Sequence, residues 1–167
     1  MARDFLSQDG TDPRSKLLSS AQDRLLSART LDDVIGIVRS TARSVCSADG
    51  VTFVLRDEGD CHYVEEDAIG PLWKGQKFPM ETCISGWCML NNKTAAIEDI
   101  FVDARIPHDV YRKTFVKSLV MVPIGRIEPI AAMGTYWRDK RAFDDRDVAA
   151  VETLASSVSD AIKRIGA

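Results

Sequence analysis

All of the strand patterns in this sequence lie between helical patterns at the two ends of the chain. Residues 13–28 repeat apolar side chains at intervals of three and four, and Pro13 stands at the expected first turn. A second helical pattern fills residues 30–46, and a long apolar stripe runs through residues 143–165. Consecutive strands between terminal helices indicate an α+β fold with an antiparallel sheet.

The strand patterns are short runs rich in β-branched and apolar residues, separated by turn residues. Three residues, "EGD", separate the first two strands, so they are predicted to form an antiparallel hairpin. Pro123 is expected at a sheet edge or bulge, because proline cannot donate to a strand ladder. The predicted strands are "GVTFVLRD" (50–57), "CHYVEED" (61–67), "KTAAIED" (93–99), "SLVMVPI" (118–124) and "IAAMGTYW" (130–137).

Two helices begin with the signature of a capping box. Thr30 is followed three residues later by Asp33, and Asp144 is followed in the same way by Asp147. In this arrangement each side chain accepts a hydrogen bond from the other residue's backbone N–H. We therefore expect helices to start at positions 31 and 145.

The section between residues 69 and 116 is irregular. It begins with a loop rich in glycine, proline and aromatic residues, and two short helices follow. One is predicted in "SGWCMLNN" with Ser85 as its N-cap, and the other in residues 106–116 with Pro107 at its start. This section must cover the second face of the sheet, and such a cover is where a small-molecule pocket is expected.

Bulk composition limits the class of protein. The 167 residues suit one domain, which we place at residues 13–167 behind a polar, disordered tail at residues 1–12. A net charge of −3 argues against nucleic acid as the main partner, because phosphate binding needs a concentrated positive surface. No apolar run approaches the ~20 residues needed to span a bilayer, and no secretory signal is visible. A cytoplasmic protein without a membrane partner is therefore expected.

The order and spacing of several segments resemble a GAF domain. They are "ISGWCMLNNKTAAIEDIFVDARI", "KSLVMVPI", "PIAAMGTYW" and "AFDDRDVAAVETLASSVSDAI". The resemblance covers about residues 20–165 and extends to the sensory GAF module near the N-terminus of bacterial sensor histidine kinases. It implies a five- or six-stranded antiparallel sheet with the terminal helices on one face. Short helices and loops would cover a pocket on the other.

The resemblance also implies a function. Members bind cyclic nucleotides, linear tetrapyrroles, haem or small metabolites, so no single cofactor is named. They commonly form homodimers through their terminal helices and relay a signal to an attached output domain. We therefore expect a sensory, non-catalytic domain in signal transduction, with an output such as a histidine kinase of a two-component system in a longer parent protein.

The expected ligand pocket lies between the sheet and the irregular section. We assign no catalytic and no metal-binding residues. The residues expected to bound the pocket are Trp73, Phe78, Cys83, Trp87, Ile100, Arg105, His108 and Tyr111.

Alternatives of other classes stay open. Cys83 and Cys88 would line the cover, so a thiol-dependent free methionine sulfoxide reductase is one of them. A covalent tetrapyrrole at Cys61–His62 is disfavoured, because this pair lies in a predicted strand before the pocket section. A dimerisation module without a ligand is the remaining alternative.

Overall fold

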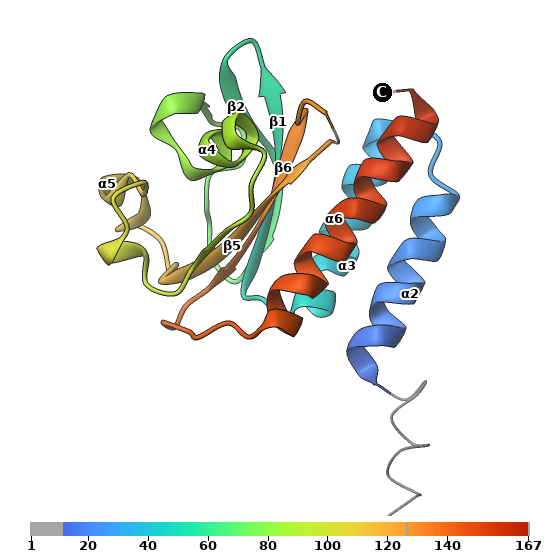
Figure 1. The fold of residues 1–167 in the computed structure, drawn as a ribbon, viewed down its shortest axis with the longest axis horizontal. Helices are drawn as coiled ribbons and strands as arrows, with labels where there is room; N and C mark the ends of the chain where they lie inside the picture. Colours follow the sequence, from blue (N-terminus) through green and yellow to red (C-terminus); the bar gives the residue numbers. More distant parts are fainter. Residues whose placement is uncertain (1–11, 126, 167) are drawn as a thin grey trace, which may run out of the picture.

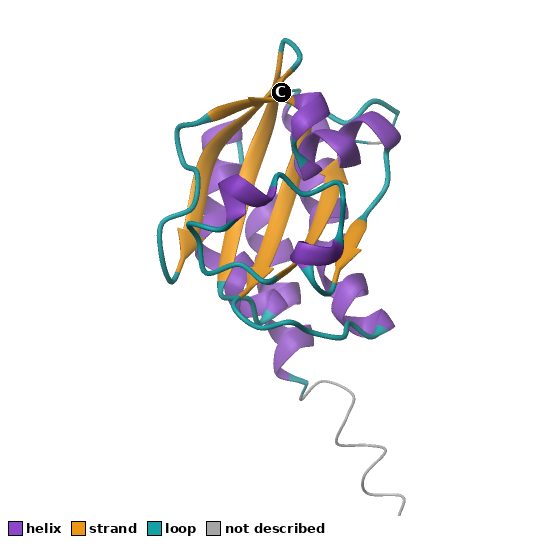
Figure 2. Ribbon diagram, turned by 90° about the vertical axis from the view of Figure 1, so that its left-hand side faces the viewer, coloured by secondary structure: helices purple, strands orange, loops and turns teal. Residues whose placement is uncertain are grey.

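The terminal helices of the computed structural model, which describes residues 12–125 and 127–166, occupy one side of a sheet, and the irregular section with its short helices occupies the other (Figures 1 and 2). α3 and α6 pack against the strands, whereas α2 packs on α3 and α6 from outside. The helices are α2 (Pro13–Leu26), α3 (Leu31–Cys46), α4 (Ile84–Asn91), α5 (His108–Tyr111) and α6 (Asp145–Ile165), with short 3-10 turns η1 (Met80–Thr82) and η2 (Ile100–Val102).

The described residues form a six-stranded sheet in the order β3-β2-β1-β6-β5-β4. All of its neighbours pair antiparallel, which confirms the α+β class and the hairpin expected at the start of the sheet. The strands are β1 (Gly50–Asp57), β2 (Asp60–Ala68), β3 (Lys77–Pro79), β4 (Ala95–Ile97), β5 (Ser118–Ile124) and β6 (Ala131–Trp137).

The central strands are buried on both faces. In β6, Met133 and Trp137 pack among the helices, while Ala132 and Tyr136 pack beneath the irregular section. Side chains alternate between the two faces of a strand, so one strand serves two separate cores. We call the irregular layer, residues 69–116, the cover.

The helices of the helical layer begin where the sequence predicts. Both capping boxes are present, with Thr30 and Asp33 at α3 and Asp144 and Asp147 at α6. The carboxylate of Asp12 accepts a hydrogen bond at the start of α2, whereas the rest of the expected tail, residues 1–11, lies outside the described residues. Over the described part of the chain, no helix is long and apolar enough to cross a membrane.

Two predictions about the cover need correction. Helix α4 has Cys83, not Ser85, as its N-cap, because the Ser85 hydroxyl lies inside the protein against Tyr63. Helix α5 ends at Tyr111 rather than near position 116, and the Thr114 hydroxyl donates to the Tyr111 carbonyl there.

Pro123 lies where its missing N–H does no harm. It is in register with β6, but β4 pairs only with residues 119–121 of β5. The part of β5 around Pro123 therefore has no strand partner on that side. The proline sits at a local edge, as its sequence position requires.

We predict that Gly86→Ala strongly destabilises the protein. A Cβ at Gly86 would lie 1.9 Å from the carbonyl oxygen of Met80, which is backbone and cannot move aside cheaply. The free energy of unfolding, measured by urea denaturation, should fall by about 2 kcal/mol or more. Gly36→Ala is the matched control, because a Cβ at this other helical glycine meets nothing within 4 Å. That change should be neutral or stabilise by up to ~1 kcal/mol. Equal effects would contradict the prediction.

Candidate functional site

Five aromatic side chains pack together between the sheet and the cover. Trp73 lies at the centre of this aromatic cluster, with ring centroids 4.7 Å from Tyr111 and 5.6 Å from both Tyr63 and Tyr136. Phe78 completes it with an edge-on contact to Tyr63 at 5.6 Å. The interior expected to hold a pocket is thus occupied here by aromatic rings from β2, β3, β6, α5 and the loop before β3.

The tyrosine hydroxyls tie the cluster to its surroundings. Tyr136 hydrogen-bonds to Thr52 of β1 at 2.8 Å, and Tyr63 hydrogen-bonds to Ser85 of α4 at 2.9 Å. Burial raises the pKa of Tyr63, Tyr111 and Tyr136 above the ordinary value, so all three stay protonated at physiological pH. The cluster is therefore a neutral, hydrogen-bonded wall.

An open groove of about 490 Å³ lies outside the cluster and shares Trp73 with it. Its walls combine apolar side chains with polar ones at the rim. The ammonium of Lys113 is exposed at this rim and makes no ion pair with the described residues. The lining residues are Pro71, Leu72, Trp73, Gln76, Phe78, Asp109, Val110, Lys113 and Thr114.

A single carboxylate holds Trp73 in place. Glu66 of β2 accepts hydrogen bonds from the backbone N–H groups of Leu72, Trp73 and Lys74, at 2.9, 2.8 and 2.7 Å. These donors lie in a loop with no strand partner of their own, and a buried backbone donor is costly when unpaired. Glu66 therefore sets the position of the loop that forms one wall of the groove.

The structure divides the eight expected site residues among different places. Trp73 and Phe78 line the groove, and Tyr111 packs behind it against Trp73. Ile100 and Cys83 are buried in the core beneath the cover. The remaining three, Trp87, Arg105 and His108, are outside the groove and are engaged in other contacts.

Arg105 and His108 stabilise the loop after η2. The Arg105 guanidinium lies 4.3 Å above the Trp87 ring and makes paired hydrogen bonds to Asp103, where it lowers the pKa of the carboxyl. The Nε2 of His108 lies 3.0 Å from the Ile100 carbonyl and 3.1 Å from that of Asp103. Carbonyl oxygens only accept, so this nitrogen carries a proton and donates.

The two cysteines of "CISGWC" have different partners. The Cys88 thiol donates to the Met121 carbonyl at 3.5 Å, and burial raises its pKa to about 12. Cys83 lies beside Cys61 of β2 instead, and the Cys61 thiol is the main reason why the pKa of Cys83 falls to about 7. All four cysteines of the chain are free and buried.

Sequence reasoning missed several residues of the site. Val110, Lys113 and Thr114 line the groove, but the helical pattern predicted there did not show which side would be exposed. Glu66 lies in the strand predicted at residues 61–67, and no local pattern there indicates that its carboxylate binds the following loop. The signal for Cys61 was present, because strand alternation places Cys61 and Tyr63 on the same face.

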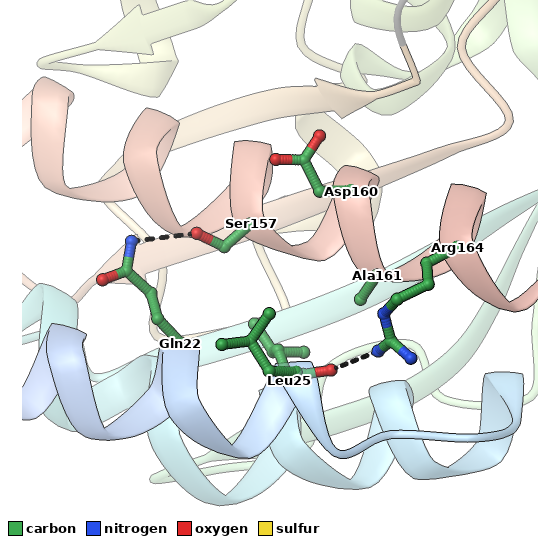
Figure 3. Close-up of a pocket in the computed structure, with 7 residues that line it drawn as sticks. Gln22, Leu25, Ser157, Asp160, Ala161 and Arg164 are labelled. Atoms are coloured by element: carbon green, nitrogen blue, oxygen red, sulfur yellow. Dashed lines mark hydrogen bonds between the residues drawn. The ribbon is translucent and has the colours of Figure 1, made fainter.

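A second groove, of about 290 Å³, runs between α2 and α6 (Figure 3). Leu25, Leu26 and Ala161 supply its apolar surface, and Leu26 is 71% exposed. Hydrogen bonds cross between the helices from Gln22 to Ser157 at 3.0 Å and from Arg164 to the Leu25 carbonyl at 2.7 Å. Helix α2 therefore packs on the helical layer but leaves apolar surface open beside α6.

No arrangement of three or more His, Cys, Asp or Glu side chains suited to a metal ion occurs within residues 12–125 and 127–166. The polar groups around the groove are an amide, a hydroxyl, an ammonium and a carboxylate at the rim. Such a set suits a small organic ligand better than a metal ion.

Comparison with known proteins identifies relatives by fold. The GAF domain family profile matches residues 28–163, and no curated protein sequence matches the chain. The GAF domain of an Acinetobacter phosphoenolpyruvate-protein phosphotransferase aligns with a TM-score of 0.78 at 14% identity, covering 93% of this chain and 96% of that one.

Two further solved structures share the fold. Free methionine-R-sulfoxide reductase from Neisseria meningitidis, in complex with its substrate, has a TM-score of 0.78 at 13% identity, over 92% of this chain and 90% of that one. Residues 122 to 287 of a methyl-accepting chemotaxis protein have a TM-score of 0.74 at 20% identity, over 87% and 96%. The TM-scores show a shared fold, and at identities this low they show the fold alone.

We predict that Glu66→Gln loosens the loop that carries Trp73. The amide keeps one acceptor oxygen for three N–H donors, so stability should fall by about 1–3 kcal/mol. Hydrogen exchange of peptides covering residues 69–76 should accelerate. Asp67→Asn on the same strand is the control, because Asp67 makes one surface ion pair with Arg43. Unchanged exchange at residues 72–74 in Glu66→Gln would refute the role of this carboxylate.

Proposed function

This chain belongs to the GAF domain family, and from this premise we propose that it is a non-catalytic sensory domain that binds a small organic molecule. The proposed site is the groove lined by Trp73, Phe78 and Val110. The observation that carries the proposal is the position of Trp73, which belongs both to the open groove and to the closed aromatic cluster.

Trp73 offers a physical path from the groove to the helices. A ligand that displaces Trp73 changes the packing of Tyr136, which lies 5.6 Å from it on β6. The next residue, Trp137, points to the opposite face and donates to the carbonyl of Ser47, the C-cap of α3. A shift of β6 would therefore be passed to the helical layer, because Tyr136 and Trp137 are adjacent residues on opposite faces of the strand. Any ligand acts only through its different affinity for the two arrangements.

The groove chemistry favours a particular class of ligand. Apolar and aromatic walls suit an apolar or aromatic body. The Lys113 ammonium at the rim, which forms no ion pair within residues 12–125 and 127–166, suits an acidic group. Asp109 at the same rim already pairs with Arg112, so it does not neutralise Lys113. We propose a small organic acid as the ligand.

The output in this proposal is an attached signalling domain such as a histidine kinase, and the signal passes through the terminal helices of a homodimer. The open apolar surface beside Leu26, between α2 and α6, supports that interface. The cytoplasmic location and the two-component context belong to the same proposal. They derive from resemblance to sensory GAF modules.

The alternative function is a thiol-dependent free methionine sulfoxide reductase. The reductase from Neisseria shares the fold, and the lowered pKa of Cys83 is a property that a thiol nucleophile needs. Cys88 is poorly suited as its partner, because its thiol donates to Met121 and its pKa is raised. Turnover of free methionine sulfoxide that stops on Cys83→Ser would favour this alternative over a sensor.

We predict that the groove retains a ligand and that filling it prevents retention. Native mass spectrometry of the purified chain should show an added mass, which Val110→Trp should remove. Val102→Trp is the control, since Val102 is 82% exposed and lies outside the groove. A wild-type protein without an added mass, whose Tm stays unchanged with a panel of aromatic and aliphatic acids, would support a dimerisation module without a ligand.

We predict that Leu26→Lys weakens the homodimer. The charge would stand on apolar surface that the interface is proposed to bury, so sedimentation velocity should show a shift toward monomer. Leu17→Lys is the matched control, because Leu17 is 42% exposed on the other side of the same helix. Equal dissociation by both variants, or by neither, would contradict an interface at the α2–α6 groove.

A further inference from the structure

The thiols of Cys61 and Cys83 come together although they lie on different elements. Cys61 is opposite Phe78 in the β2–β3 ladder, and the chain then turns back through η1. This return places the Cys83 sulfur 3.6 Å from the Pro79 carbonyl and 3.4 Å from the Ser85 hydroxyl. The Cys61 thiol interacts with both Cys83 and Ser85. We call these two residues the thiol pair.

The two members of the thiol pair differ in ionisation. Hydrogen bonding from Cys61 is the largest cause that lowers the pKa of Cys83 to about 7, and Ser85 and the Gly86 N–H of α4 add to it. The pKa of Cys61 is raised by the same interaction and by burial. By contrast, burial raises the pKa of Cys46 to about 12. Cys83 therefore loses its proton more readily than Cys61 or Cys46, and the thiolate is the reactive form.

Access to solvent also differs within the thiol pair. Cys83 is 7% exposed, at the start of α4, whereas Cys61 is fully enclosed. A small oxidant can thus approach Cys83 first, and Cys61 stands behind it as the nearest thiol. This order is the one that a reversible dithiol site requires, with an attacking and a resolving cysteine.

We propose that Cys61 and Cys83 form a site of reversible oxidation, at which a hydroperoxide oxidises Cys83 and Cys61 then closes a disulfide. In the first step the Cys83 thiolate attacks one oxygen of hydrogen peroxide. The O–O bond breaks, hydroxide leaves, and Cys83 becomes a sulfenic acid. In the second step the Cys61 sulfur attacks the Cys83 sulfur, the S–O bond breaks, and water leaves with the Cys61 proton. Two thiols and one peroxide give one disulfide and two waters.

The new bond would tie the sheet to the cover. It would join β2 to the first turn of α4, beside the hydrogen bond between Tyr63 and Ser85. This modification does not depend on the proposed ligand, because none of its groups needs a groove occupant. The disulfide would make the cover respond to peroxide as well as to a ligand in the groove.

The test uses the reduced 167-residue chain and equimolar hydrogen peroxide, quenched with N-ethylmaleimide. The intact mass of a parallel sample without N-ethylmaleimide should fall by about 2 Da, and dithiothreitol should restore it. Peptide mapping of the quenched sample should find Cys61 joined to Cys83. Cys46→Ala and Cys88→Ala are controls that should keep the disulfide. In Cys61→Ala the reaction should stop at a sulfenic acid on Cys83, which dimedone traps.

The pH dependence of alkylation separates this role from a merely structural one. The rate of Cys83 modification by iodoacetamide should have a midpoint near pH 7 in the wild type. In Cys61→Ala the midpoint should move upward, because the main donor to the thiolate is lost. A disulfide between Cys83 and Cys88, or oxidation of Cys83 no faster than that of Cys46, would overturn the proposal. Peptide mapping of the wild type identifies the bonded cysteines even if a variant does not fold.

Discussion

The burial of both faces of the central strands is the constraint on which this structure depends. β5 and β6 expose almost nothing, so each face needs its own layer. Helices satisfy their own backbone groups and can cover one face without help from side chains. Much of the cover is loop, so some of its N–H and C=O groups pair with side chains instead of a helix or strand ladder. Glu66 and His108 are such partners, the first accepting from three N–H groups and the second donating to two carbonyls.

A β-bulge makes this arrangement possible. The register between β1 and β2 shifts between Phe53 and Val54, which leaves Val64 without an opposite residue. Without the shift, Tyr63 and Glu66 would point to opposite faces, since they are three residues apart. With it, Tyr63 joins the aromatic cluster and Glu66 reaches the loop above the same face. The extra residue thus allows Tyr63 and Glu66 to point to the same face of the sheet, toward the aromatic cluster and the loop of Trp73.

The sequence predicts the helix capping boxes, but it does not predict which way the side chains of the cover point. The capping boxes at Thr30 and Asp144 depend on residues three apart, so pattern alone identifies them. Ser85 looked equally like an N-cap, but its hydroxyl is taken by Tyr63, a residue distant in sequence. The same limit applies to the eight expected site residues. Their positions in the chain assign them to the cover, yet Trp87 faces Arg105 while Trp73 faces the groove, and only long-range packing decides between these directions.

The short strand β3 connects the two inputs that we propose. It pairs only with residues 60–62 of β2, which leaves it the least supported strand of the sheet on this side. Phe78 lines the groove and stands opposite Cys61, and the next residue, Pro79, presents its carbonyl to Cys83. A disulfide between Cys61 and Cys83 would therefore restrain Phe78, the groove residue that lies opposite Cys61 and next to Pro79. A ligand in contact with Phe78 would act on the same strand, so any coupling between ligand affinity and the redox state of the thiol pair would be reciprocal, each changing the other by the same free energy.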